Sequence, residues 1–232
     1  MKEDTEDSSH LNTSNFMTSF LADHAPPTES ISHFKSISWL QPLITSPKYK
    51  VIPTFSRHLK SSGEDYFFSR TINTTVTIPH MISIQLRDFN TPEPSNSPPP
   101  SSTSHKTPAI APSHPDALTL LSLSSPGLNG HPSTLHGGVT CAILDETMGL
   151  LIMLHDNNTK ADGKEERDSL YTANLNVTYR APVPTPGEVL VKTWLVGRQG
   201  RKWYSKGQIV DREGVVLAEA DGLWVTARRQ KM

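Results

Sequence analysis

The sequence predicts an α+β domain that combines an antiparallel sheet with one long helix. Residues 137–155 carry apolar side chains at spacings of three and four, which is the pattern of a helix face. Residues 117–123 before this helix form an apolar run typical of a strand. Four further strand-like runs follow the helix: 169–180, 188–197, 202–211 and 215–227. The short breaks between them favour antiparallel pairing, because parallel strands need long crossovers.

The remaining segments differ in composition. Residues 1–30 are acidic and rich in Ser and Thr, which predicts a disordered N-terminus. Residues 31–90 hold too few apolar side chains for a core of their own. We therefore expect this extension to dock on the main domain, residues 116–228. Residues 91–115 are dominated by Pro, Ser and Thr, which predicts a loop or tether rather than a packed element.

Two elements are expected inside the extension. A short helix over residues 33–45 fits the spacing of its apolar side chains, although Pro42 interrupts or kinks it. Residues 81–86 have the composition of a strand.

Bulk composition narrows the class of protein. The 22 basic and 23 acidic residues nearly cancel, so no global field steers the chain toward nucleic acid. Cys141 is the only cysteine, which excludes an intramolecular disulfide and a cysteine-based zinc site. The chain begins with an acidic stretch unlike a targeting peptide, and its longest apolar region, 139–154, is predicted to be too short to span a bilayer. We expect no transmembrane segment and a cytoplasmic location, with a mitochondrial one left open.

One motif stands out at the start of the predicted helix. His136, Gly137 and Gly138 open the helix, and Asp145 lies inside its apolar pattern. Asp is unfavourable within a helix and costs free energy to bury, so this carboxylate is a candidate for chemistry. Glu146 is the rival acid. It lies about 100° around the helix, so we expect it to be structural or solvent-facing.

Residues 135–149 resemble the hotdog-fold acyl-CoA thioesterases, in the branch of the phenylacetate-pathway enzyme and the thioesterase superfamily members. In that family a His-Gly-Gly caps the central helix, and an acidic residue nine positions after the His is the catalytic base or nucleophile. His136 and Asp145 have this spacing. Two later segments also match, a strand and a basic turn: 171–182 and 200–203. The resemblance implies a hotdog fold, in which the sheet wraps around the helix.

The helix N-terminus and the carboxylate suggest two parts of a hydrolytic site. Backbone N–H groups of Gly138 or Gly137 can stabilise an oxyanion, and His136 can orient this loop or contact substrate. Asp145 lies about 10 Å along the axis from Gly138 at about 1.5 Å per residue, too far for both to serve one carbonyl. The distance predicts a site shared between two chains. The resemblance implies the same arrangement, a homodimer or a dimer of dimers.

The strand 169–180 is predicted to place Leu175, Val177 and Tyr179 on one face. Its polar residues then share the other face: Thr172, Asn174, Asn176, Thr178 and Arg180. The resemblance implies that Thr172 positions the attacking water beside the acid. It also implies that Thr178 and Arg180 contact coenzyme A, and we assign Asn174 to the substrate with them.

Further cations lie at a predicted turn. The resemblance makes Arg201 and Lys202 anchors for the phosphates of coenzyme A, which cations bind well. Asn129 is one residue from a position at which some family members contact the carbonyl, and we do not expect it to be catalytic. Cys141 is interpreted as a packed small residue.

The predicted activity is hydrolysis of an acyl-CoA or acyl-carrier thioester to the free acid and the thiol, with no cofactor or metal beyond the coenzyme A of the substrate. A first alternative is release or editing of a polyketide-type thioester in a biosynthetic pathway. A second is a non-catalytic hotdog dimer that binds acyl-CoA or a protein partner. The chain has no G-x-S-x-G motif, which disfavours a serine-based thioesterase.

Overall fold

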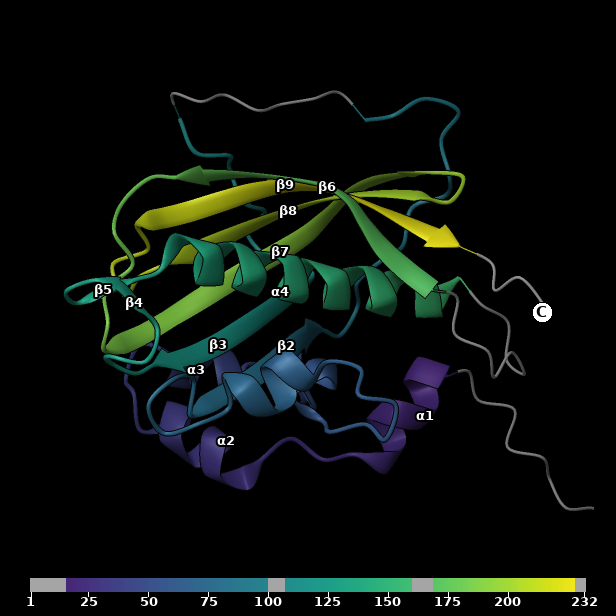
Figure 1. The fold of residues 1–232 in the computed structure, drawn as a ribbon. Coiled ribbons are helices and arrows are strands. Elements are labelled where there is room, and N and C mark those ends of the chain that lie inside the picture. Colours follow the sequence, from purple (N-terminus) through teal and green to yellow (C-terminus); the bar gives the residue numbers. More distant parts are fainter. Residues whose placement is uncertain (1–15, 100–106, 160–168, 228–232) are drawn as a thin grey trace, which may run out of the picture.

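The computed structural model describes residues 16–99, 107–159 and 169–227, in which a seven-stranded antiparallel sheet curves around the helix α4 (Gly137–Asn158) (Figure 1). The order across the sheet is β1-β2-β3-β7-β8-β9-β6. The strands are β1 (Tyr49–Ile52), β2 (His80–Leu86), β3 (Ala117–Leu123), β6 (Ser169–Tyr179), β7 (Gly187–Gln199), β8 (Lys202–Val210) and β9 (Val216–Ala227). A short hairpin of β4 (Asn129–His131) and β5 (Thr134–Leu135) leads into the helix. The predicted hotdog fold is confirmed.

The helix α4 packs closely against the sheet. Its apolar face joins Trp203 and Trp224 in the main core, together with aliphatic side chains of β3 and β7. Two glycines of the sheet allow this approach: a Cβ at Gly207 would lie 2.8 Å from Met148 Sδ of the helix, and one at Gly222 would lie 3.0 Å from Met148 Cε. The helix therefore sits where no larger residue could replace these glycines without movement.

The prediction that the apolar region is too short to span a bilayer is wrong, because the helix that contains this region is longer than the apolar run in the sequence. The helix α4 has 22 residues and is long and apolar enough to cross a membrane by those measures alone. Half of its most apolar window is buried inside the domain, where it forms the centre of the fold. This placement accounts for its apolar composition.

The N-terminal extension packs against the domain. Strands β1 and β2 lengthen the sheet beyond β3. Helices α2 (Thr28–Lys35) and α3 (Gln41–Thr45) belong to the layer that covers the outer face of this half, in a second core built around Phe34, Leu40, Ile82, Leu118 and Leu190. Helix α1 (Phe16–Asp23) packs beside the C-terminal half of α4 through Met17 and Phe20 (Figure 1).

Two expectations for this region need correction. Disorder was expected for residues 1–30, but residues 16–30 contain α1 and the start of α2, whose apolar side chains gain burial against the domain; residues 1–15 lie outside the described part. The helix expected over 33–45 is two helices. Pro42 lies in the first turn of α3, where a proline needs no N–H partner, so it helps to begin a helix rather than to kink one.

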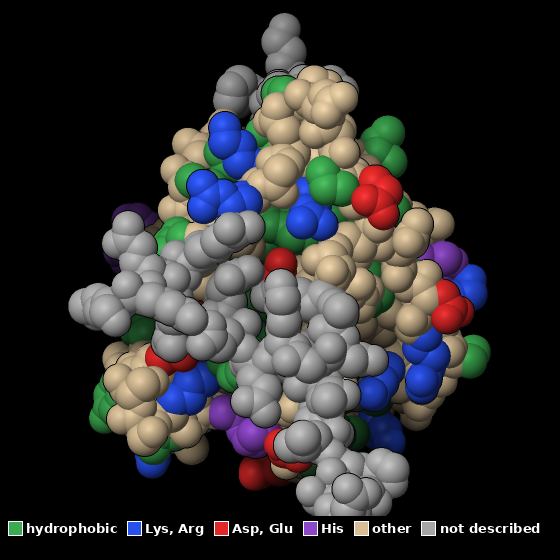
Figure 2. All heavy atoms as spheres, turned by 90° about the vertical axis from the view of Figure 1, so that its right-hand side faces the viewer, with side chains coloured by type: hydrophobic (Ala, Val, Ile, Leu, Met, Phe, Trp, Pro, Cys, Tyr) green, Lys and Arg blue, Asp and Glu red, His purple; other side chains and the backbone are tan. Residues whose placement is uncertain are grey.

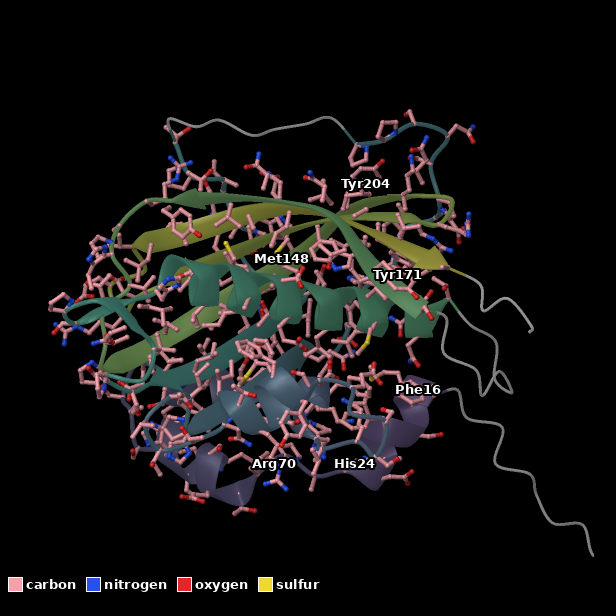
Figure 3. The ribbon with its side chains drawn as sticks, in the orientation of Figure 1. Phe16, His24, Arg70, Met148, Tyr171 and Tyr204 are labelled. Atoms are coloured by element: carbon pink, nitrogen blue, oxygen red, sulfur yellow. The ribbon has the colours of Figure 1, made fainter. Side chains whose placement is uncertain are left out.

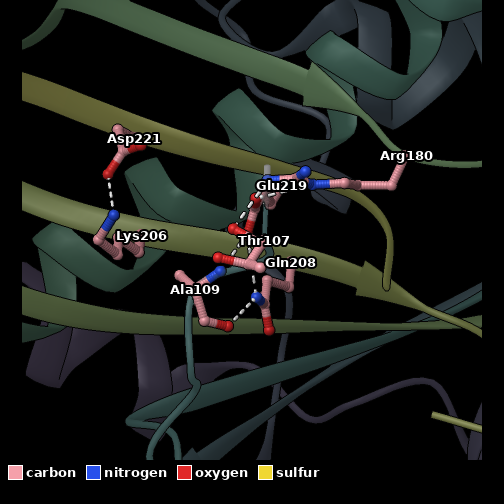
Figure 4. A network of polar contacts seen from close by, with 7 residues as sticks. All are labelled: Thr107, Ala109, Arg180, Lys206, Gln208, Glu219 and Asp221. Carbon is pink, nitrogen blue, oxygen red and sulfur yellow. Dashed lines mark hydrogen bonds and ion pairs between the residues drawn. The ribbon is translucent and has the colours of Figure 1, made fainter. Parts of the chain in front are cut away.

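The described parts of the Pro-rich segment 91–115 form a largely exposed loop that hydrogen bonds hold against the sheet. Its described parts, 91–99 and 107–115, contain no helix or strand and run over the outer face of the sheet (Figure 1). Ser95 N donates to Arg198 O at 2.8 Å. Further along, Ala109 N donates to Glu219 Oε2 at 2.8 Å, and Gln208 Nε2 donates to Ala109 O at 2.7 Å (Figure 4). Backbone hydrogen bonds to the sheet fix a segment whose composition favours no regular structure.

Candidate functional site

Asp145 and Thr172 meet between α4 and the edge strand β6. Thr172 Oγ1 donates to Asp145 Oδ1 at 2.8 Å. Both residues line a cavity of about 140 Å³. Its other lining residues are Phe55, Glu64, Asp65, Glu146, Gly149, Leu150, Met153, Leu170 and Trp224. The hydroxyl engages one carboxylate oxygen, so the structure brings the two predicted catalytic side chains together.

Glu146 lines the same cavity, which corrects the expectation that it points elsewhere. Neighbouring helix positions can share a cavity because the glutamate side chain is longer by one methylene. Burial and, to a smaller extent, the negative charges of Asp65 and Asp145 raise the pKa of Glu146 to about 7. Ser56 and Lys60 nearby lower this pKa in part. At neutral pH, Glu146 is therefore close to half protonated.

The N-terminus of α4 forms a second cluster. His136 is the N-cap residue, and Gly138 N donates to its Nδ1 at 2.9 Å. Gly137 N donates to no group in the described part of the chain. Of the two predicted oxyanion donors, Gly138 is thus engaged by the cap and Gly137 is the available one.

Tyr179 of β6 completes this second cluster. Its hydroxyl donates to Gly137 O at 2.9 Å and lies 2.9 Å from Cys141 Sγ. The contact with Cys141 and burial raise the pKa of Tyr179 to about 12, so the phenol stays protonated. Cys141 is half-buried and packs against this hydroxyl. The side chain ties the end of β6 to the start of the helix.

The two clusters are separated along α4. Gly137 and Asp145 are eight residues apart, which is about 12 Å along the axis at about 1.5 Å per residue. The strand β6 runs past both, from Thr172 to Tyr179. The Gly137 N–H and the Asp145 carboxylate of one chain are therefore too far apart to act on the same carbonyl group.

The predicted polar face of β6 needs one correction, at Thr172, which lies on the opposite side from Asn174 and Arg180. The pairing of β6 with β9 shifts between Thr172 and Asn174, and this bulge reverses the alternation. Thr172 faces α4, but after the bulge it is Leu175 and Val177 that pack toward the core. Asn174 instead lines a separate cavity of about 460 Å³ with Tyr204, Lys206 and Asp221 on the outer side of the sheet.

Arg180 is likewise on the outer side. Its Nε donates to Glu219 Oε1 at 3.0 Å, and its Nη2 donates to Thr107 O at 3.1 Å (Figure 4). Alternation places Asn176 and Thr178 on this side with Asn174 and Arg180. The structure thus separates Thr172 from the three other residues of β6 that were predicted to bind substrate.

Arg201 and Lys202 are exposed at the turn between β7 and β8. Lys202 of β8 pairs with Val225 of β9, and Val225 in turn pairs with Tyr171, near the start of β6. Arg180 follows Tyr179, the last residue of β6. About eight residues of strand, or about 26 Å at about 3.3 Å per residue, separate these cations. Figure 2 views the end of the molecule that holds this turn and shows Lys and Arg side chains on its surface. The predicted coenzyme A contacts do not converge within one chain.

Asn129 has a structural role consistent with the expectation that it is not catalytic. Its side chain donates to Ser125 Oγ at 3.0 Å and accepts a hydrogen bond from Thr185 Oγ1. Next to it, a Cβ at Gly130 would lie 2.9 Å from His136 Cα, so the glycine lets the hairpin pass close to the helix cap.

Sequence reasoning missed the residues of the extension that line the Asp145 cavity, namely Phe55, Glu64 and Asp65. No pattern in residues 53–65 links them to a carboxylate 80 positions later, and only the fold brings them together. Within residues 16–99, 107–159 and 169–227, no group of three His, Cys, Asp or Glu side chains is arranged to hold a metal ion.

Residues 133–218 match the sequence profile of the Thioesterase superfamily. The acyl-coenzyme A thioesterase THEM4 from Mus musculus is 30% identical over 106 residues, which are 45% of this chain and 40% of that protein. The same enzyme from Bos taurus is 30% identical over 108 residues, 46% of this chain and 39% of that protein. The match spans about two fifths of these relatives. Thioesterase superfamily member 2 from zebrafish superposes with a TM-score of 0.40 at 15% identity, over 51% of this chain and 78% of that chain.

Proposed function

We propose that this chain hydrolyses the thioester of an acyl-coenzyme A to the free acid and the thiol, since residues 133–218 match the model of the Thioesterase superfamily. The observation that carries the proposal is the carboxylate of Asp145 on α4, held at 2.8 Å by the Thr172 hydroxyl in a cavity between helix and edge strand. The similarity to acyl-coenzyme A thioesterases supports this substrate class.

Asp145 acts as the general base in this proposal. The Thr172 hydroxyl donates to Oδ1, which leaves Oδ2 free to accept a proton and the Thr172 oxygen free to accept a hydrogen bond from water. The water oxygen attacks the thioester carbon while its proton passes to Asp145. The carbon–sulfur bond then breaks, and the departing thiolate takes a proton. Direct attack by the Asp145 carboxylate is the alternative route, with hydrolysis of the resulting anhydride.

We further propose that the oxyanion donor comes from a second copy of the chain. The Gly137 N–H is available but lies about 12 Å from Asp145 of the same helix. The strand β6 is the last strand of the described sheet and pairs only with β9 there. A partner that pairs along this 11-residue edge would bring a second α4 near the first. The resulting homodimer would contain two sites, each built from both chains.

The base role is tested by a thiol-release assay on Asp145→Asn. The turnover number should fall about 10²–10⁴-fold, as for the loss of a general base. Glu213→Gln is the matched control, because it removes a carboxylate exposed in the β8–β9 turn. A fall of less than about tenfold in a folded Asp145→Asn protein would overturn this role. Release of thiol from an acyl-carrier protein but not from coenzyme A would favour the biosynthetic alternative.

The shared site is tested by mixing two inactive variants, Asp145→Asn and Gly137→Pro. A heterodimer keeps one intact site of two, so random reassociation should restore about a quarter of the wild-type turnover. A mixture no more active than its components, in which heterodimers are shown to form, would contradict a site shared between chains.

A further inference from the structure

Glu146 of α4 lies against the segment 53–65 of the extension. This segment connects β1 to the π-helix η2 (Phe67–Thr71) and includes the short 3₁₀ helix η1 (Phe55–Arg57). Burial has the largest effect on the pKa of Glu146, and three side chains of the segment also act on it: Ser56, Lys60 and Asp65. Figure 3 shows side chains of the extension, Phe16 among them, on the side of α4 away from the sheet.

Asp145 and Glu146 line the same cavity but differ in their neighbours. Asp145 accepts the hydrogen bond of Thr172 from the edge strand β6. Glu146 is buried against the segment 53–65, and burial raises its pKa to about 7. About half of the molecules therefore keep this proton at neutral pH, where an ordinary glutamate has lost it. Two carboxyl groups whose surroundings differ in this way can serve as the base and the acid of one reaction.

The other described residues of the cavity lining offer few sources of a proton. The lining contains no Lys, Arg, His, Tyr or Cys among the residues that the structure describes. Asp65 forms an ion pair with Lys60, and Glu64 is the remaining carboxyl group. The strands β6 and β9 contribute only side chains that do not titrate: Leu170, Thr172 and Trp224. Glu146 is thus the buried acid closest in sequence and in space to the base.

The proposed hydrolysis needs a proton at sulfur. The water proton passes to Asp145, so a second group has to supply the proton that the departing thiolate takes. A thiol such as that of coenzyme A has a pKa close to that of cysteine, about 8.5. A carboxyl group with a pKa near 7 transfers its proton to such a thiolate favourably and is still protonated in part at neutral pH. The sulfur is bonded to the carbon that water attacks, so it lies beside Asp145 as well.

We propose that Glu146 is the general acid of this hydrolysis and donates its proton to the sulfur of the departing thiol, while Asp145 activates the water. The role rests on the proposed thioesterase function, because it assigns the second proton transfer of that reaction.

The two carboxyl groups then complete one cycle. The oxygen of the water bonds to the thioester carbon, and one of its protons passes to Asp145. The carbon–sulfur bond breaks, and its electron pair stays on the sulfur, which takes the proton of Glu146. The proton on Asp145 then passes to the Glu146 carboxylate, which restores both groups and leaves the free acid and the thiol.

A comparison of leaving groups tests this proton transfer. Butyryl-coenzyme A releases a weakly acidic thiol, whereas the butyryl thioester of nitrothiophenol releases a thiolate that needs no proton. At pH 6.5, Glu146→Gln should lower the turnover number for butyryl-coenzyme A by at least about tenfold and leave that for the aromatic ester within about threefold. Asp145→Asn should slow both substrates, because each needs the activated water.

Two further variants serve as controls. Glu64→Gln removes another carboxyl group of the same cavity lining and should stay within about threefold of wild type with both substrates. Glu146→Asp keeps a carboxyl group that is shorter by one methylene. It should recover part of the turnover with butyryl-coenzyme A that Glu146→Gln loses.

The pH profile provides a readout that a purely structural role would not move. Wild-type kcat/KM for butyryl-coenzyme A should fall above about pH 7, as Glu146 loses its proton. Asp65→Asn removes a negative charge that raises this pKa and frees Lys60, whose positive charge lowers it, so the fall should begin at a lower pH. Asparagine is accepted there, because the φ of 57° at Asp65 lies in the left-handed region that Asn also adopts. In Glu146→Gln this fall should be absent.

An equal loss of turnover for both substrates in a folded Glu146→Gln protein would overturn the role as an acid. So would a fall above pH 7 that persists in this variant. Neither result would touch the proposed function as long as Asp145→Asn slows both substrates. Wild-type protein that releases thiol from neither ester would overturn the proposed function, and the role of Glu146 with it.

Discussion

Glu146 should make the stability of the protein depend on pH. Burial raises its pKa from 4.5 to about 7. Well below pH 4.5 the carboxyl is protonated in both the folded and the unfolded chain, so it contributes no difference. Between pH 4.5 and 7 the unfolded chain releases this proton and the folded chain keeps it, so the free energy of unfolding falls as pH rises. At about 1.4 kcal/mol for each pKa step, the loss approaches about 3 kcal/mol at pH 8.

Substitution of Glu146 by Gln should abolish this loss, because the amide has no proton to release. Urea denaturation at pH 5 and pH 8 gives the free energy of unfolding of each protein. The difference between Glu146→Gln and wild type should grow by about 2–3 kcal/mol in favour of the variant from pH 5 to pH 8. Glu213→Gln should follow wild type at both values, because its carboxyl is exposed. A Glu146→Gln protein that loses as much stability as wild type over this range would refute the reasoning.

Three further substitutions test the start of α4, the core and the segment 53–65. Gly137→Pro removes the available N–H at the first position of α4. Proline is accepted there, and the extended ψ of 132° at His136 suits the residue before a proline. The turnover number should fall about 10²–10³-fold, whereas that of Gly137→Ala, which keeps the N–H, should stay within about threefold of wild type. Gly222→Ala forces a Cβ against the Trp224 ring and should lower the free energy of unfolding, measured by urea denaturation, by about 2–3 kcal/mol. Gly187→Ala is the control, because its Cβ would lie 3.5 Å from its nearest neighbour. Arg57→Met leaves the carbonyl oxygens of Phe68 and Ile78 without their donor and should lower the free energy of unfolding by about 3 kcal/mol in the same assay. A decrease below about 1 kcal/mol would mean that other contacts hold the segment 53–65 in place.

The central architecture could be predicted because it depends on patterns that repeat along the chain. The strand predicted over residues 117–123 has those bounds in the structure, and the helix begins at Gly137 as predicted. The helix buries an apolar stripe and the strand is a short apolar run buried along nearly its whole length, so composition and spacing suffice to find them. The Asp145–Thr172 contact was also anticipated, but from the family resemblance rather than from spacing.

The wall of the cavity could not be predicted in this way. Phe55, Glu64 and Asp65 belong to a segment with almost no regular secondary structure, fixed by hydrogen bonds from Arg57 to distant carbonyls and by packing against α1. Contacts of this kind join positions without any periodic signal. The role of Glu146 was missed for a related reason, since its surroundings come from the same distant segment.

The bulge in β6 explains why the predicted alternation of side chains along this strand fails at Thr172. Thr172 and Tyr179 are seven positions apart, so a regular strand would point them to opposite faces. One extra residue between Thr172 and Asn174 restores a common face, and both side chains reach α4, at Asp145 and at Gly137. The same shift turns Asn174 and Arg180 outward. The local departure from regular pairing therefore lets one edge strand contact α4 at both Asp145 and Gly137, and a sequence interpretation that assumes a regular strand must misplace one of the two side chains.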